Sequence, residues 1–226
     1  MKKIIAHRGV FNNTDIPENS IKSFKEAVEL NIDVEFDVQI TKDNILVVFH
    51  DDNLFRMTGI NKKVEDSTYE EISNLTLLDT REKIPTLDEV LKTINNRVFM
   101  DIEIKNNKRY KVLCDLLVDK LKEYKNYSLK SFNPMIVRYI NKKYPDINIG
   151  YLIGDKYDFK ILKYILPTKF MIKYSKCDFI SISKKLLKKN KFKLLSKIYP
   201  TQIWTIKDMK EITDDKYTYI CNNIKK

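Results

Sequence analysis

Residues 33–51 read DVEFDVQITKDNILVVFHD, and this stretch decides how the rest of the chain is interpreted. Its first half alternates apolar with acidic or polar side chains, which is typical of a β-strand, and Lys42-Asp43-Asn44 is a tight-turn signal before a second apolar run. In such a strand, Glu35 and Asp37 point to the same side. An antiparallel hairpin about the turn places residue 37 opposite residue 49, so His50 returns beside the two carboxylates.

The strand pattern recurs along the chain and alternates mostly with helical patterns. Leaving the second hairpin arm aside, the predicted strands begin near residues 3, 34, 98, 127, 147, 179, 202 and 217. Eight strands separated by helices are typical of a closed (β/α)8 barrel, a fold of the α/β class. An open doubly wound sheet is the alternative, but the chain contains no GxGxxG or GxxxxGK[ST] motif.

We expect one domain over residues 1–226, with a small insertion at about residues 40–95 between the second and third barrel strands. The insertion consists of the hairpin and the two helices after it. Asn19 or Ser20 is the expected N-cap of the first helix, and Asp66 or Ser67 that of the second. The periodicity predicts helices at residues 21–30, 69–75, 86–94, 108–124, 134–143, 159–166, 186–198 and 208–212.

The composition is that of a soluble globular enzyme, with 43% hydrophobic and 32% charged residues. No window approaches the roughly 18 uninterrupted apolar residues of a spanning helix. The apolar run in the opening MKKIIAHRGV is too short for a signal peptide, so we expect a cytoplasmic protein. Cys114, Cys177 and Cys221 lie far apart in the sequence and form no CxxC pair. We therefore expect neither a disulfide framework nor a zinc site.

The net charge of +11 comes from the second half of the chain. Residues 1–110 contain 16 Lys and Arg against 20 Asp and Glu, whereas residues 111–226 contain 26 against 11. Only six of the basic residues are arginine, which base readout and bidentate phosphate contacts favour. We therefore expect a lysine-rich surface that associates with membranes weakly through charge, and no specific nucleic-acid partner.

The strongest polar signals fall where predicted barrel strands end, which is where such barrels place their active sites. Carboxylates inside a barrel are costly to bury unless they share a cation. Three carboxylates with no soft ligand suit a hard divalent ion, Mg2+ or Ca2+. The residues of this group are His7, Glu35, Asp37, His50, Glu103 and Lys105.

These residues also have structural interpretations. A single histidine is more often structural than catalytic, and Lys105 could simply pair with Glu103 or Asp101. The chain has only two histidines, however, and both fall at strand ends beside the carboxylates. Two histidines, a hard cation and nearby Arg8 and Lys105 fit phosphodiester cleavage, in which one histidine accepts a proton and the other donates one.

An ordered set of motifs resembles the glycerophosphodiester phosphodiesterase family. The resemblance is dense over residues 4–105 and sparse afterwards. The motifs are His7-Arg8-Gly9, Pro17-Glu18-Asn19-Ser20, Glu35-Phe36-Asp37-Val38, Thr41-Lys42-Asp43, Val47-Val48-Phe49-His50-Asp51, Leu54, Arg56, Thr58-Gly59, Ile84-Pro85-Thr86-Leu87, Glu103-Ile104-Lys105, Ser131-Phe132 and Trp204-Thr205.

The resemblance implies a metal-dependent hydrolase that cleaves glycerophosphodiesters to sn-glycerol 3-phosphate and an alcohol. It implies His7 and His50 as the general acid and base and a divalent cation, Mg2+ or Ca2+, at the three carboxylates. It places Arg8 and Lys105 near the substrate phosphate. The metal ligands implied are Glu35, Asp37 and Glu103, and the residues implied for the substrate pocket are Phe132 and Trp204.

The chain departs from the family pattern in its second half. The Trp-Thr strand usually continues to Asn, where this chain has Lys207, and the last strand usually ends in Thr-Asp, where it has Cys221-Asn222. These changes leave open which alcohol is released. Trimming of glycerol-phosphate-containing capsule or teichoic polymers, and a catalytically inactive barrel used as a binding module, remain alternatives.

Overall fold

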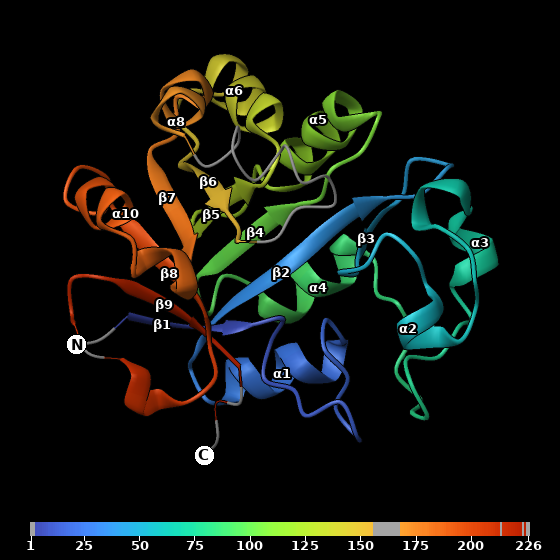
Figure 1. Cartoon of the computed structure of the whole chain (residues 1–226). Coiled ribbons are helices and arrows are strands. Elements are labelled where there is room, and N and C mark those ends of the chain that lie inside the picture. The colour runs from blue at the N-terminus through green and yellow to red at the C-terminus, as the bar shows by residue number, and fades with distance from the viewer. Residues whose placement is uncertain (1–2, 156–167, 213, 223, 225–226) are drawn as a thin grey trace.

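A closed barrel of eight parallel strands forms the centre of the computed structural model (Figure 1). The structure describes residues 3–155, 168–212, 214–222 and 224. The strands pair in the order β1-β9-β8-β7-β6-β5-β4-β2, and β1 pairs with β2 to close the ring. The (β/α)8 prediction is therefore confirmed. The barrel strands are β1 (Lys3–His7), β2 (Asp33–Ile40), β4 (Met100–Ile104), β5 (Tyr127–Ser131), β6 (Ile149–Ile153), β7 (Phe179–Ser183), β8 (Thr201–Ile206) and β9 (Thr218–Cys221).

The helices between the strands follow the predicted order, with several differences. Short helices at 55–58 and 64–66 were not predicted, and the helix predicted at 208–212 is a 3-10 helix over 209–211. The predicted helix at 186–198 is divided in two, because the backbone is extended at Lys189 (φ −86, ψ 133). A helix that we did not predict begins after Thr168, whose side chain caps it. The predicted helix at 159–166 lies outside the described residues. The α-helices are α1 (Ile21–Glu29), α2 (Phe55–Thr58), α3 (Tyr69–Ile72), α4 (Leu87–Ile94), α5 (Tyr110–Lys120), α6 (Pro134–Lys143), α8 (Lys169–Ser175), α9 (Lys184–Leu187) and α10 (Asn190–Leu195), and the 3-10 helices are η1 (Val64–Asp66) and η2 (Met209–Glu211).

Side-chain caps fix where the helices begin. Ser20 accepts a hydrogen bond from the Ser23 backbone N–H at the start of α1, as predicted. The prediction of Asp66 or Ser67 as the cap of α3 is wrong. Thr68 forms a capping box with Glu71, whereas the Ser67 hydroxyl donates to the Lys63 carbonyl and is not available.

The hairpin after the second strand has the predicted register. β3 (Leu46–Val48) pairs antiparallel with the end of β2, with Val38 opposite Val48 and Ile40 opposite Leu46. Beyond it, the segment up to Ile84 has a small hydrophobic cluster of its own, whose members are Val47, Phe49, Leu54, Met57, Val64, Ile72, Leu77 and Ile84. The buried residues of α4 belong instead to the main core, so α4 is a barrel helix.

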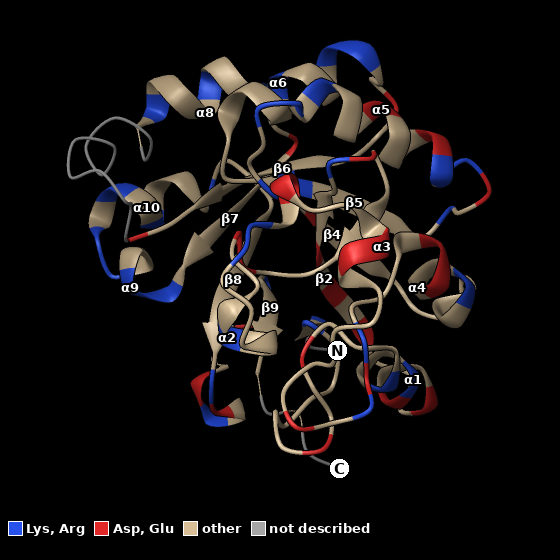
Figure 2. Cartoon of the chain, turned by 90° about the vertical axis from the view of Figure 1, so that its right-hand side faces the viewer, with Lys and Arg blue, Asp and Glu red and all other residues tan. Residues whose placement is uncertain are grey.

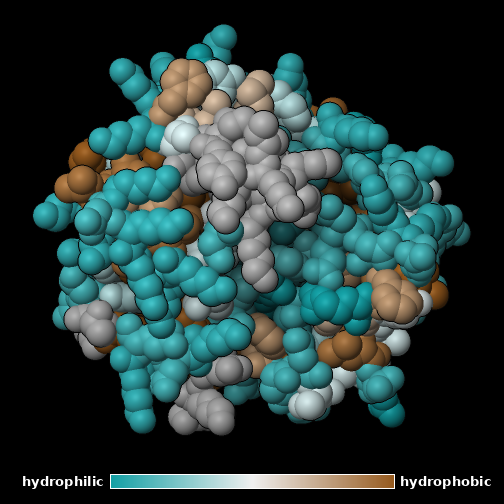
Figure 3. Space-filling view, viewed as in Figure 1, coloured by the Kyte–Doolittle hydropathy of each residue, from teal (hydrophilic) through white to brown (hydrophobic). Residues whose placement is uncertain are grey.

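Charge is unevenly distributed over the helices (Figure 2). In Figure 2 the charged segments of α6, α8, α9 and α10 are blue, those of α3 are red, and α1 and α4 carry both colours. The face shown in Figure 3 is mostly hydrophilic, with hydrophobic side chains between the polar ones on the side where α10 and β8 lie. No helix among the described residues is long and apolar enough to cross a membrane.

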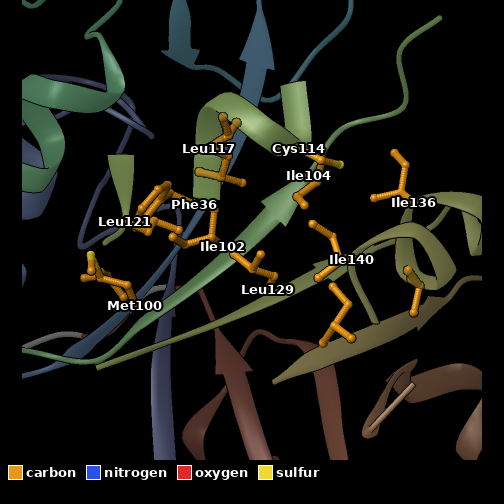
Figure 4. Packing of buried hydrophobic residues seen from close by; sticks show 14 of the residues in the cluster. Phe36, Met100, Ile102, Ile104, Cys114, Leu117, Leu121, Leu129, Ile136 and Ile140 are labelled. Carbon is orange, nitrogen blue, oxygen red and sulfur yellow. The ribbon is translucent and has the colours of Figure 1, made fainter. Parts of the chain in front are cut away.

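The main hydrophobic core lies outside the barrel, between the strands and the helices around them. Figure 4 shows buried apolar residues of β2, β4 and β5 packed against residues of α5 and α6. Because side chains alternate along a strand, the polar residues of the same strands point into the barrel. The polar side of the alternating pattern therefore builds the interior where the candidate site lies.

Candidate active site

Three buried carboxylates meet at the end of the barrel. Asp37 of β2 is paired in register with Glu103 of β4, and Glu35 lies one pleat away on the same face. One oxygen of each carboxylate lies within 4.8 Å of the others, and the residues are only 1–6% exposed. The structure thus brings together all three residues predicted as metal ligands. Such a cluster of oxygen donors can hold a hard divalent cation.

The carboxylates differ in how easily they ionise. Burial raises the pKa of Glu35 and of Glu103, and mutual repulsion with Asp37 raises both further. Burial would also raise the pKa of Asp37, but the charges of His50, Lys105 and Arg8 hold it well below its usual range. A cation shared by the three groups would relieve both the burial and the repulsion.

A buried ion pair lies directly beneath this cluster. Lys130 of β5 is 1% exposed, and its Nζ atom is 2.7 Å from Asp101 Oδ2 and 3.2 Å from Glu35 Oε1. Asp101 also accepts a hydrogen bond from the Ser128 hydroxyl at 2.7 Å. The pair therefore fixes one oxygen of Glu35. The other oxygen accepts a hydrogen bond from the Arg8 backbone N–H at 3.2 Å.

Two cations stand at the mouth of the cluster. Lys105 Nζ lies 2.9 Å from Glu103 and 3.5 Å from Asp37, so it pairs with Glu103 as one interpretation predicted, whereas Asp101 pairs with Lys130. The Arg8 guanidinium bonds to Glu18 at 2.6 Å and lies 3.7 Å from Asp37. The atom nearest to Asp37 is Nε, which is buried and has no hydrogen-bond partner among the described residues. Burial lowers the pKa of each cation, but the neighbouring carboxylates raise it above the ordinary value.

His7 is the last residue of β1, and its ring is held by a residue directly after the last strand, β9. Its Nδ1 atom lies 2.6 Å from Asn222 Oδ1, and its Nε2 atom lies 3.9 Å from Glu35. Because an amide oxygen only accepts, Nδ1 carries the hydrogen and Nε2 has the free electron pair. Burial and the positive charge of Arg8 lower the pKa of His7 to about 3, so the ring is neutral near neutral pH.

His50 has a carboxylate where His7 has an amide. Its Nδ1 atom lies 2.5 Å from Asp51 Oδ1, and Asp51 in turn bonds to Arg56 at 2.5 Å. A carboxylate at Nδ1 accepts the hydrogen of that atom and leaves Nε2 as the outward atom. The two predicted proton carriers therefore have different surroundings.

The Pro17-Glu18-Asn19-Ser20 motif connects these parts. Glu18 bonds to both Arg8 and Arg56, at 2.6 and 2.7 Å, and their opposing charges hold its pKa at about 2 although burial would raise it. Asn19 donates to Asp37 Oδ2 at 3.0 Å. One short motif thus orients two arginines and a carboxylate.

The two predicted aromatic residues of the substrate pocket lie together. Phe132, directly after β5, and Trp204 of β8 form an edge-to-face pair with ring centroids 5.6 Å apart. Both are half-buried, and the Trp204 Nε1 atom is buried and has no hydrogen-bond partner within the part of the chain that the structure describes. Phe132 follows the C-terminal end of β5, and Trp204 lies in the second half of β8, with β6 and β7 between the two strands. Both therefore lie toward the end of the barrel at which His7 ends its strand.

Known proteins share both the sequence pattern and the fold. The model of the glycerophosphoryl diester phosphodiesterase family matches residues 7–191. A glycerophosphodiester phosphodiesterase of Caldanaerobacter subterraneus is 39% identical over 161 residues, which are 66% of this chain and 65% of that protein. A second, from Bacillus altitudinis, is 33% identical over 69% of this chain and 68% of its own. The crystal structure of a glycerophosphodiester phosphodiesterase from Parabacteroides distasonis superimposes with a TM-score of 0.80 at 26% identity, over 98% of this chain and 92% of that one.

The chain belongs to the glycerophosphoryl diester phosphodiesterase family. Its departures from the family pattern can now be placed in the structure. Lys207 is exposed after β8, and Cys221 is buried among the apolar residues outside β8 and β9. Asn222 is the departure that reaches the site, because it holds His7.

Sequence reasoning did not place Lys130, Asp101 and Asn222 in the site. It named Asp101 only as an alternative partner of Lys105 and Asn222 only as a departure from the family pattern. Asp101 shares the polar face of its strand with Glu103, and this alternation is the signal that could have placed it inside the barrel. Lys130 follows apolar Leu129 in the same alternating way, but the second half of the chain is rich in lysine. The sequence therefore does not distinguish this lysine from those on the surface. The link from Asn222 to His7 spans 215 residues, and only barrel closure brings them together.

Proposed function

We propose that the protein hydrolyses glycerophosphodiesters to sn-glycerol 3-phosphate and an alcohol, using His7 and His50 as proton carriers and a divalent cation at Glu35, Asp37 and Glu103. The observation that carries the proposal is the gathering of three buried carboxylates, two histidines and two cations at one end of the barrel. Family membership supports the same reaction class.

The charge balance of the barrel interior supports a divalent cation. Three cationic side chains, Arg8, Lys105 and Lys130, contact the carboxylates of the interior. These carboxylates are Glu35, Asp37, Asp101 and Glu103, so the ionised group has an excess of one negative charge and would repel a phosphodiester anion. Adding two positive charges reverses the sign. A bound cation would supply Lewis-acid withdrawal of charge from the phosphoryl oxygens; Mg2+ and Ca2+ both suit the oxygen donors.

Arg8 and Lys105 are the side chains proposed to bind the phosphate. The Arg8 Nε–H is buried, lies 3.7 Å from Asp37 Oδ2 and forms no hydrogen bond within the described residues, so it is proposed to donate to a phosphate oxygen. Lys105 is 14% exposed, so its Nζ atom faces both the carboxylates and the open end of the barrel. Both positive charges would stabilise the negative charge that develops on the phosphoryl oxygens during transfer.

His7 is proposed as the base. Its neutral ring presents the Nε2 electron pair, since Nδ1 is committed to Asn222. This atom would accept the proton of the attacking hydroxyl as the new phosphorus–oxygen bond forms. If the hydroxyl belongs to water, the products are glycerol 3-phosphate and the alcohol. If it belongs to a neighbouring glycerol carbon, the first product is a cyclic phosphate, and a water molecule must then attack the phosphorus and open the ring to give glycerol 3-phosphate.

His50 is proposed as the acid. With Nδ1 held by Asp51, its Nε2–H would give a proton to the oxygen of the departing alcohol as the second phosphorus–oxygen bond breaks. Phe132 and Trp204 are proposed to border the organic part of the substrate, with the Trp204 Nε1–H as a donor for one of its hydroxyls.

The buried free thiols of Cys114, Cys177 and Cys221 support a reducing compartment such as the cytoplasm.

The test is release of glycerol 3-phosphate from glycerophosphocholine and glycerophosphoglycerol, with a glycerol-phosphate polymer offered in parallel. EDTA should abolish release, and titration with Mg2+ or Ca2+ should restore it. His7→Gln and His50→Gln should each lose at least 100-fold in kcat/KM, since general acid–base catalysis contributes about 100- to 10,000-fold. Glu103→Gln should also lose activity, because it removes one of the three carboxylates proposed to hold the cation. Glu70→Gln, on the exposed face of α3, is the matched control. Turnover that survives EDTA, or that survives His7→Gln, would refute the mechanism.

A further inference from the structure

A pocket opens on the outside of the barrel, away from the candidate active site. The connection between β8 and β9, residues 207–217, carries only the three-residue η2 among its described residues, so these strands have no full covering helix there. The pocket left at this place has a volume of about 480 Å3. Its apolar wall consists of Leu187, Ile203, Ile206, Tyr217 and Tyr219.

Lysines surround this apolar wall. The stretch Lys184–Lys197 contains seven lysines and no acidic residue. Two of them have carboxylate partners, Lys184 with Glu211 and Lys185 with Asp155. Within the described part of the chain, the other five form no ion pair. Of these five, Lys188, Lys193 and Lys197 line the pocket, together with Lys184 and Lys216.

Exposed apolar side chains flank the lysine rim. Leu194 and Ile198 are 54% and 67% exposed and directly follow Lys193 and Lys197, and Met209 of η2 is 44% exposed. Leu194 belongs to the last turn of α10, and Ile198 lies in the turn directly after this helix, which ends at Leu195. Hydrophobic side chains are visible between polar ones on this side in Figure 3. Basic residues beside exposed leucine and isoleucine are the pattern of an interfacial membrane-binding surface.

We propose that this pocket and its rim, the α9–α10 surface, bind the anionic lipid bilayer, with phospholipid head groups at Lys188, Lys193 and Lys197 and with Leu194 and Ile198 in the interface. Charge complementarity selects an anionic partner. The apolar wall and the absence of arginine from the pocket lining favour lipid over nucleic acid, which arginine recognises better. A second copy of the chain would bring like charges together. The proposal does not depend on the catalytic function, because no residue of the surface belongs to the candidate active site.

The test is co-sedimentation of the whole chain with vesicles of phosphatidylcholine alone or of phosphatidylcholine mixed with phosphatidylglycerol. We expect binding to the mixed vesicles only, decreasing as salt is raised. The Lys188→Glu/Lys193→Glu/Lys197→Glu variant should bind more weakly by on the order of 100-fold, since each lysine near an anionic surface contributes several-fold. Leu194→Ser/Ile198→Ser should remove the binding that persists at high salt.

The matched control is Lys92→Glu/Lys111→Glu/Lys142→Glu, which makes the same charge change at exposed lysines of α4, α5 and α6. Circular dichroism melting checks that both triple variants are folded, and hydrolysis of a small diester should be equal in both. The proposal is overturned if the wild type ignores anionic vesicles, if the control loses as much binding as the α9–α10 variant, or if duplex DNA binds at the same lysines more tightly than the vesicles do.

Discussion

The Nδ1 atom of His7 donates a hydrogen bond to Asn222 Oδ1 over 2.6 Å, and this bond joins the ends of the first and last strands of the barrel. It fixes the ring with Nε2 directed toward Glu35. An amide oxygen fixes the tautomer of His7 without adding charge. An aspartate, which the family usually has at this position, would fix the same tautomer and would also place a negative charge beside the ring. The protein therefore keeps His7 neutral over a wide range of pH.

Asn222→Asp should shift the pH profile of catalysis. A carboxylate at Nδ1 stabilises the imidazolium, so the pKa of His7 should rise from its value of about 3. Because the base works only when neutral, the acidic limb of kcat/KM should move to higher pH, by roughly 1–3 units. The measurement is kcat/KM for a glycerophosphodiester against pH in both proteins at saturating metal.

The control for this prediction is Asn126→Asp, which adds the same charge at an exposed position at the opposite end of β4 and β5. Its profile should superimpose on that of the wild type. An unshifted acidic limb in Asn222→Asp, with Asn222→Ala also unshifted, would show that this hydrogen bond does not position the base.

Lys130→Met should destabilise the protein and weaken its metal site together. The substitution leaves Asp101 and Glu35 buried without their cation, a change that costs about 3–5 kcal/mol. Freed from Lys130, Glu35 loses one of the two contacts that orient its oxygens, and loss of such a partner typically lowers metal affinity about 10–100-fold. Urea unfolding and titration of activity with Mg2+ measure the two effects.

A double variant separates charge from packing at this pair. Lys130→Met/Asp101→Asn removes both charges, so it should be more stable than Lys130→Met alone. Lys120→Met, which breaks only the exposed pair with Asp88, should cost less than about 1 kcal/mol. If Lys130→Met costs no more than Lys120→Met, the buried pair does not support the site.

Periodicity was sufficient to predict the barrel and its hairpin, because each depends on local alternation. The register that places Val38 opposite Val48 follows from the turn at Lys42-Asp43-Asn44 alone. The three carboxylates followed from the same alternation, since an acid on the inner face of a barrel strand is costly and therefore informative.

The partners of these residues could not be predicted in the same way. Which cation reaches Glu35 depends on the shear of the closed barrel, which brings Lys130 across from β5. Glu18 was visible as a motif residue, but its bridge between Arg8 and Arg56 depends on how the loop before α1 folds over the rim. The break between α9 and α10 is a single extended residue within a continuous helical pattern.

Glu18→Gln should make stability less dependent on pH in the acidic range. Opposing arginine charges lower the pKa of Glu18 from 4.5 to about 2, so its ionised form stabilises the folded state above pH 4.5. This contribution, roughly 3 kcal/mol, is lost as pH falls from about 4.5 toward 2. Unfolding free energies of the wild type and Glu18→Gln should therefore differ most near pH 6 and converge near pH 2. The exposed Glu70→Gln should show no such convergence, and a constant difference for Glu18→Gln would contradict the bridge.

Gly150→Ala should destabilise the protein, although the backbone conformation at Gly150 is one that alanine can adopt. Gly150 of β6 is paired with Phe179 of β7, and a Cβ atom added at Gly150 would lie 2.2 Å from the Phe179 ring. The ring is large and buried in the barrel, so it can move only at the expense of its own packing, and overpacking of this kind costs about 1–3 kcal/mol. Adding Phe179→Leu should recover part of the loss, because the smaller side chain makes room for the methyl group. Thermal melting of the two single variants and the double variant tests this, and additive losses would show that the contact is not the cause.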